Sequence, residues 1–527
     1  MLGVELTLSV LNAVLLTALV APLVLWRYRR AVLAGMTTRP GALLVPADPL
    51  PLPAPQDGDV QAALRWERRL HHRVFAALLV VVFVCALPLS ALFVVLGDLP
   101  RTPTHVYLKA GVIATLAVPM VAVLLGWPFR LALWRWIVTL LALDAVGVAL
   151  SMLQRPFYGR APTLDQLLNF IAFLQLAGVT LALPLLLLLA TGARRVRGVA
   201  PIVLAALLLF GLAPQLGMRL TVWLSGTQTG ARWLLLSGLG LDIGFVLLAL
   251  PVGLIAWWRL KALARGYEAK RFSDVQLLLR TWWLLVVAVE AVDSINAHAD
   301  ATWLVLITAA VVVALFAPLL TAALRRAAAL PGRPPPRTLL VLRVFGDTAR
   351  SESLFDRVVA RWRWFGPVTL IAAPDVIART VDPGDFLRFA SGRIASSFVT
   401  SAADLHERLQ ALDLRADPDG RFRVNEFCCN DSTWQATVVQ LIARADVVLM
   451  DLRGFNAQRA GCAFELGELA RRRQPQQVVL LADASTDRVL LEPLLGSGAQ
   501  RLPLVELPRG GAKAFDDVFP RLLRAAG

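Results

Sequence analysis

The sequence predicts an α-helical membrane domain followed by an α/β domain built on a flavodoxin-like parallel sheet. Apolar residues make up 57% of the chain, against about 45–50% in soluble domains, and the excess precedes residue 324. Beyond a Pro-rich stretch, apolar runs shorten and alternate with helical patterns, which is typical of βα repeats. We therefore expect a transmembrane domain at 1–324, a linker at 325–337 and a cytoplasmic domain at 338–527.

About nine segments before the linker are long and apolar enough for a membrane helix, which needs about 20 residues. The expected spans are 3–26, 74–97, 105–127, 133–153, 167–191, 199–218, 233–258, 276–295 and 301–323. Placing the N-terminus outside puts 22 Lys and Arg residues in the inner connections and 5 in the outer ones, as the positive-inside rule requires. We therefore expect a multi-pass protein of the inner (plasma) membrane with a cytoplasmic C-terminal domain.

The formal charge of +16 does not predict nucleic-acid binding, because many of the arginines flank apolar runs, where they fit topology signals and lipid headgroups. The four cysteines have no zinc-ligand spacing and predict free thiols in a reducing compartment. No metal site is predicted. The lipid bilayer is therefore the first partner that the composition indicates.

Two acidic residues fall inside predicted spans. Asp144 is near the middle of the fourth span, and Asp242 is in the seventh, within GLDIG. A charge in hydrocarbon is costly, so such residues suggest an ion or solute path. Hydrogen bonding between helices is the alternative, and it is the one that we favour.

The α/β domain is expected to hold six strands, each followed by a helix. The strands are expected at 338–345, 367–373, 421–428, 447–451, 477–482 and 501–507. The helices are expected at 352–364, 385–412, 433–445, 457–472, 486–495 and 513–526. Ligands of open parallel sheets bind beyond the carboxyl ends of the strands, so we expect the residues that follow each strand to form a ligand site.

Polar residues follow most of these strands and predict a rim that suits a ribose- or nucleotide-like ligand. The candidates for ligand binding are Gly346, Asp347, Asp431, Asp451, Arg453 and Asn456. The alternative is that Asp, Asn and Ser at these turns only cap the following helices. Asp431 and Ser485 are the two residues that look most like caps.

Glu465 lies about two turns into the helix after the central strand and is the candidate catalytic residue. Ala460, Gly461 and Ala463 near it are small, so the helix can approach the sheet or a ligand closely. A carboxylate held there among apolar groups is expected to have a raised pKa and could serve as an acid or base. A surface glutamate in a charged helix is the alternative.

The stretch IARADVVLMDLRGFNAQRAGCAFELGEL resembles the TIR and nucleoside-deoxyribosyltransferase-like superfamily, as does the opening LRVFGDTARSESLF. The match at Phe464–Gly467 is similar to the Tyr-Glu-Leu-Gly of the transferases, although Gly461 replaces the usual Trp before Cys. The runs DPDGRFRVNE and GCAFEL also resemble a group of bacterial polytopic membrane proteins. The resemblance implies that Glu465 acts at C1′ of a ribosyl group and that Gly346, Asp347, Asp451 and Asn456 line the pocket.

Three functions are consistent with these features. The first is a membrane-anchored signalling or sensing protein whose domain binds a nucleotide or a protein partner, including a second copy of itself. The second is an NAD(P) glycohydrolase or a related enzyme that cleaves N-glycosidic bonds with Glu465. The third is a transporter that the cytoplasmic domain regulates. No cofactor is required by any of them, and NAD or a related nucleotide is the ligand that the resemblance implies.

Overall fold

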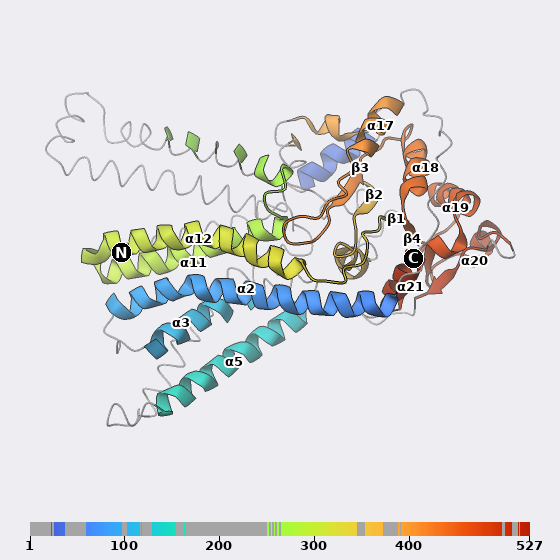
Figure 1. Ribbon diagram of the computed structural model, residues 1–527. Helices are drawn as coiled ribbons and strands as arrows, with labels where there is room; N and C mark the ends of the chain where they lie inside the picture. Colours follow the sequence, from blue (N-terminus) through green and yellow to red (C-terminus); the bar gives the residue numbers. More distant parts are fainter. Residues whose placement is uncertain are drawn as a thin grey trace, which may run out of the picture. The chain divides into compact units, whose positions relative to one another are not determined.

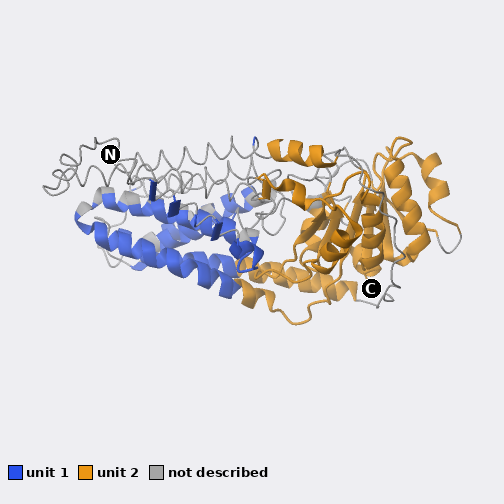
Figure 2. Ribbon diagram, turned by 90° about the horizontal axis from the view of Figure 1, so that it is seen from above, with its two compact units in different colours: residues 1–25, 77–323, 382–384 blue, residues 26–76, 324–381, 385–527 orange. Residues whose placement is uncertain are grey.

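The computed structural model divides the chain into two compact units (Figure 2). It describes residues 23, 26–36, 59–96, 103–115, 117–118, 129–153, 163, 265–344, 354–372, 388–389, 392–497, 501–507, 515 and 517–526, with scattered positions from 250 to 262. The first unit comprises 1–25, 77–323 and 382–384, and the second comprises 26–76, 324–381 and 385–527. The boundary falls inside two long helices, so each of these helices contributes residues to both units.

The described part of the first unit is helical. Its described helices are α2 (Val60–Leu96), α3 (Pro103–Thr115), α5 (Phe129–Leu153), α11 (Asp274–Ala297), η1 (Ala299–Ala301) and α12 (Thr302–Ala328), where α2 and α12 extend into the second unit. Within the described ranges, α2 and α12 are long and apolar enough to cross a membrane, which is compatible with membrane association. The described residues hold two candidate spans rather than the nine expected. The expected spans 105–127 and 276–295 correspond to shorter apolar segments, Val106–Thr115 and Gln276–Ala288. The segments 3–26, 167–191, 199–218 and 233–258 fall largely outside the described residues.

A partly buried ion pair and aromatic packing hold described parts of this unit together. Lys109 of α3 contacts Glu290 of α11 at 2.6 Å, and its ammonium lies 3.2 Å from the ring centre of Phe93. The rings of Trp283 and Phe316 stack at 4.9 Å between α11 and α12. Lys109 and Glu290 therefore neutralise each other, although they are far apart along the chain.

The second unit contains a six-stranded sheet in which every adjacent pair is parallel (Figure 1). Its strands are β1 (Leu339–Arg343), β2 (Val368–Ile371), β3 (Val424–Phe427), β4 (Val447–Asp451), β5 (Val478–Ala482) and β6 (Leu504–Glu506). All six fall at the expected places. Four of them, β1, β2, β4 and β5, are buried throughout, which explains their continuous apolar runs.

The strand order is 3-2-1-4-5-6. This is the order of the Rossmann type of doubly wound sheet, whereas a flavodoxin-like sheet has the order 2-1-3-4-5. The flavodoxin-like prediction was therefore wrong in detail. The chain builds outward from β1 through β2 to β3 before it crosses back to β4, so the order reverses between β1 and β4.

The connecting helices are mostly shorter than expected. They are η2 (Phe355–Val359), α14 (Ala360–Trp362), η3 (Ile394–Ser397), α17 (Ala402–Gln410), α18 (Trp434–Arg444), α19 (Ala460–Arg472), η4 (Pro475–Gln477), α20 (Arg488–Leu491), η5 (Glu492–Leu494) and α21 (Val518–Ala525). The predicted helix at 385–412 is not continuous: in its described part, 388–389 are helical, η3 is a short 3-10 helix and α17 is the longer α-helix. Ser401 begins that helix, because its hydroxyl accepts a hydrogen bond from Asp404 N.

Candidate functional site

The site begins where the strand order reverses, at the carboxyl ends of β1 and β4. Arg343 ends β1 and Asp451 ends β4, and the two are register partners in the sheet. Both are buried, although each carries a charged side chain. Ligands of doubly wound sheets bind at this type of position, because the loops on either side of it run to opposite faces of the sheet.

Asp451 and Arg453 form a buried ion pair at this edge. Arg453 Nε donates to Asp451 Oδ1 at 2.8 Å, and Nη2 donates to Oδ2 at 2.6 Å. The turn makes the pair possible: Phe455 N donates to Leu452 O, and Gly454 has φ +80°, a conformation that glycine adopts readily. The two predicted ligand-binding residues are thus close together and already neutralise each other.

Glu465 lies on α19, the helix that follows this turn, and only 2% of it is exposed. Its Oε2 has no hydrogen-bond partner. Burial raises the pKa of Glu465 to about 8, and the nearby positive charge of Arg343 limits the rise. The side chain is therefore mainly protonated at neutral pH, as the sequence predicted for a carboxylate held among apolar groups.

Cys462 connects α19 to the end of β1. Its thiol donates to Arg343 O at 3.7 Å, one helical turn before Glu465. Burial raises the pKa of Cys462 to about 12, and the charge of Glu465 adds to the rise. This thiol is therefore a packing and hydrogen-bonding group, because only the thiolate is a nucleophile.

The small residues of α19 allow its first turn to pack against α18. A Cβ added at Gly461 would lie 3.6 Å from the Trp434 ring, which is ordinary van der Waals contact. The rings of Trp434 and Phe464 meet edge to face at 5.3 Å. An indole therefore covers this part of α19 from the neighbouring helix.

We expect Gly461→Ala to stabilise the α/β domain by about 0.5–1 kcal/mol, since alanine favours a helix interior and the added methyl group meets no obstacle. Thermal unfolding of the purified chain in detergent would measure the change. Gly467→Ala, where a Cβ meets nothing within 4 Å, is the matched control for helix propensity alone. A loss of stability only in Gly461→Ala would contradict the contact described.

Two of the predicted ligand-binding residues are not part of this centre. Asp431 is exposed after β3, which lies three strand positions from β4, or about 14 Å. Asn456 is exposed, and its side chain accepts from Gln458 N at 3.0 Å, which shapes the loop before α19. Asp431 does not cap α18 either, because the oxygen that accepts hydrogen bonds in that turn is Asn430 Oδ1.

Three of the other predicted residues, Gly346, Asp347 and Asp242, are outside the described residues. Asp144 is described and lies within helix α5, which covers the predicted fourth span. Ser485 is not the cap of α20; Asp487 is, because it accepts from Val489 N and Leu490 N.

Two acidic residues in the turn before β3 are engaged by arginines. Asp419 accepts from Arg421 at 2.9 Å, and Asp417 accepts from Arg423 at 3.0 Å. Gly420 has φ +89° and its N–H donates to Asp417 O, which closes a tight turn. In the described part of the chain, no group of three His, Cys, Asp or Glu side chains could hold a metal ion.

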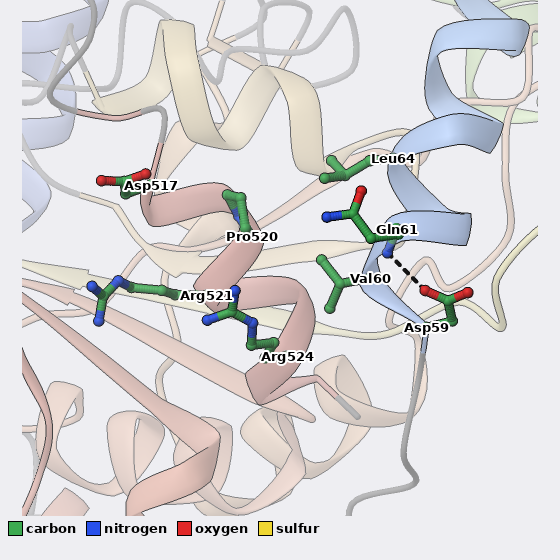
Figure 3. Close-up of a pocket in the computed structure, with 8 residues that line it drawn as sticks. All are labelled: Asp59, Val60, Gln61, Leu64, Asp517, Pro520, Arg521 and Arg524. Atoms are coloured by element: carbon green, nitrogen blue, oxygen red, sulfur yellow. Dashed lines mark hydrogen bonds between the residues drawn. The ribbon is translucent and has the colours of Figure 1, made fainter.

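A cavity of about 560 Å³ lies elsewhere in the second unit, between the start of α2 and α21 (Figure 3). Its lining includes Leu64 and Pro520 together with two exposed arginines, Arg521 and Arg524. Asp59 at its edge already accepts from Gln61 N at 2.8 Å. None of the predicted site residues lines this cavity.

Arg343 is the member of the site that the sequence analysis missed. It appears in the sequence as one charge inside the run TLLVLRVF, and nothing local distinguishes it from a surface arginine. Its position as the last residue of a strand next to the reversal of strand order would have identified it, but that order is visible only in the folded sheet.

Comparisons of the chain with known protein families, with curated proteins and with solved structures each found no match.

Proposed function

We propose that the chain is a membrane-anchored signalling or sensing protein whose α/β domain binds a nucleotide-like ligand at the carboxyl ends of β1 and β4. The observation that carries the proposal is the free Oε2 of Glu465, buried beside the point where the strand order reverses. A buried polar atom without a partner is rare in native proteins and often has a functional explanation. A ligand hydroxyl would give this oxygen its missing hydrogen bond.

The surrounding charges suit a ligand that carries both hydroxyl and phosphate groups. Arg453 can bind two oxygens side by side, as it does with the Asp451 carboxylate. Asp451 is an acceptor for ribose hydroxyls at the end of a central strand. A phosphate on Arg453 would free Asp451 for such a hydroxyl, so the ligand would replace the internal ion pair.

Membrane anchoring is supported by the two helices that are long and apolar enough to span a bilayer. The multi-pass arrangement with nine spans, the outer N-terminus and the cytoplasmic α/β domain belong to the proposal, where the distribution of Lys and Arg supports them. The proposal also includes association between the α/β domains of several copies of the chain.

Binding is tested on the full chain in lipid nanodiscs by equilibrium dialysis with radiolabelled NAD. We expect saturable binding that Asp451→Asn weakens at least tenfold (about 1.4 kcal/mol), because the amide oxygen of asparagine is a weaker acceptor for ribose hydroxyls than a carboxylate. Asp404→Asn is the matched control, since Asp404 pairs with Arg408 on α17 away from the site. Equal binding by wild type and Asp451→Asn would contradict the assignment of the site.

An enzyme that cleaves the N-glycosidic bond is the second candidate, because the carboxyl group of Glu465 is buried near Arg343 at the candidate ligand site. In such a reaction water adds to C1′, the bond to nicotinamide breaks, nicotinamide leaves with the electron pair and one proton is released. A carboxylate is needed to stabilise the positive charge that develops at C1′. Glu465 would supply it only after losing its proton.

If Glu465 acts in this way, kcat/KM for NAD cleavage should rise about tenfold per pH unit below pH 8 and then level off. A chromatographic assay of nicotinamide release between pH 5.5 and 9.5 would measure the profile. Glu465→Gln should lose the activity at every pH. Activity that is unchanged in Glu465→Gln, or a flat profile, would count against the enzyme and leave the binding function standing.

A further inference from the structure

The connection between β1 and β2 contacts α2, the apolar helix that contributes to both units. It contains the π-helix η2, then α14, then the residues up to Gly366 that precede β2. Arg361 of α14 donates from Nε and Nη2 to the two carboxylate oxygens of Glu67, at 2.5 and 2.6 Å. Glu67 is 2% exposed, so its charge is neutralised inside the protein.

Aromatic and backbone contacts surround this ion pair. The ring of Trp66, next to Glu67, meets Phe365 edge to face at 5.7 Å, and its Nε1 donates to Leu330 O at 3.4 Å. The guanidinium of Arg361 lies 3.9 Å from the ring centre of Phe519 on α21. The first part of α2 is therefore packed as an integral part of the α/β domain.

The packing near Gly366 leaves little room for displacement. A Cβ at Gly366 would lie 1.9 Å from Arg337 O, and Trp362 Nε1 donates to the same carbonyl at 3.1 Å. A displacement of α2 must therefore move residues 361–366 with it or break the contacts. Beyond Ala76, α2 continues as a single helix to Leu96, a further 30 Å or so.

We propose that the ion pair between Glu67 and Arg361 couples α2 to the candidate ligand site through η2, because Arg357 of η2 and Arg453 of the site lie 5.8 and 5.3 Å from the centre of the same ring, that of Phe515. This regulation rests on the proposed function, because it acts on the same site. The π-helix η2 is the element that takes up the displacement. A π-helix carries one residue more per turn than an α-helix and occurs often at functional sites, so a change of η2 to α would move Arg361 by roughly 1.5 Å.

Hydrogen exchange measured by mass spectrometry on the full chain in nanodiscs tests the coupling without any ligand. In Glu67→Gln, we expect exchange about tenfold faster at 60–76 and 354–366, and also at 339–344 and 460–469, which belong to the candidate site. Arg361→Lys keeps the charge but loses the paired contact, and should give the same pattern in weaker form. Glu506→Gln, which removes an exposed pair with Arg488, is the matched control and should change only its own strand.

A second arm adds NAD and separates the two proposals. Protection at 447–466 tests the proposed function, and its spread to 60–76 in wild type but not in Glu67→Gln tests the coupling. Protection at 447–466 that never reaches 60–76 would overturn the coupling and leave the function standing. If NAD protects no peptide, that result counts against a nucleotide ligand. The experiment without NAD then decides the coupling. Faster exchange confined to 60–76 and 354–366 in Glu67→Gln would overturn the coupling.

Discussion

Replacing Glu465 with glutamine is expected to make the α/β domain more stable than wild type as the pH rises. The folded pKa of Glu465 is about 8 and its ordinary value is 4.5, so the folded state holds the proton between these values while the unfolded state releases it. Stability is therefore greatest at low pH and is lost as the pH rises toward 8. Between pH 5 and pH 7 the difference in unfolding free energy between Glu465→Gln and wild type should grow by about 2.5 kcal/mol.

Comparing the two proteins at each pH removes the contribution of all other titrating groups, which the variants share. It also cancels any pH-independent difference in unfolding free energy between a buried amide and a buried carboxyl group. Hydrogen exchange of the full chain, followed at peptides from α19, measures this free energy. Each exchange rate is divided by the intrinsic rate at the same pH to give the free energy of opening. A difference that does not change between pH 5 and pH 7 would show that Glu465 is ionised in the folded protein, and the acid–base role would lose its basis.

Replacing Arg473 with leucine is expected to cost about 3–5 kcal/mol of stability in the α/β domain. Arg473 is buried, and its Nη2 donates to the carbonyl oxygens of both Ile442 and Ala445, where α18 ends before β4. Its Nη1 donates to Gln477 Oε1 at 3.2 Å. Leucine would leave two buried carbonyls without donors, and each such loss costs about 1–3 kcal/mol.

Burial lowers the pKa of Arg473 to about 10, so the guanidinium stays charged at neutral pH. Arg473→Lys should recover part of the stability, because an ammonium can reach one of the carbonyls. Arg444→Leu is the matched control: Arg444 is exposed on α18 and bonds only to Gln440 at 2.7 Å. Equal thermal unfolding midpoints for Arg473→Leu and Arg444→Leu would show that the carbonyls find other donors.

The sequence predicted the strands well because their signal is local. Each of the six strands is a short run bounded by polar or Pro and Gly residues, and in β1, β2, β4 and β5 burial on both faces makes the run largely apolar. The helices were predicted less well. Residues 385–412 have helix-forming composition, yet Gly392 takes φ +73° and Ser401 begins a new helix, so tertiary context overrides the propensity.

The sequence by itself determined that an apolar helical part is followed by a parallel α/β domain, and that Glu465 lies on the helix after a central strand. These features depend on periodicity and order along the chain. Tertiary structure decided the strand order, the place of Arg343 beside Asp451, and the ion pair between Glu67 and Arg361. Glu67 and Arg361 are 294 positions apart. Whether such a pair forms depends on how the burial of two charges balances against their attraction, and only the packed fold sets that balance.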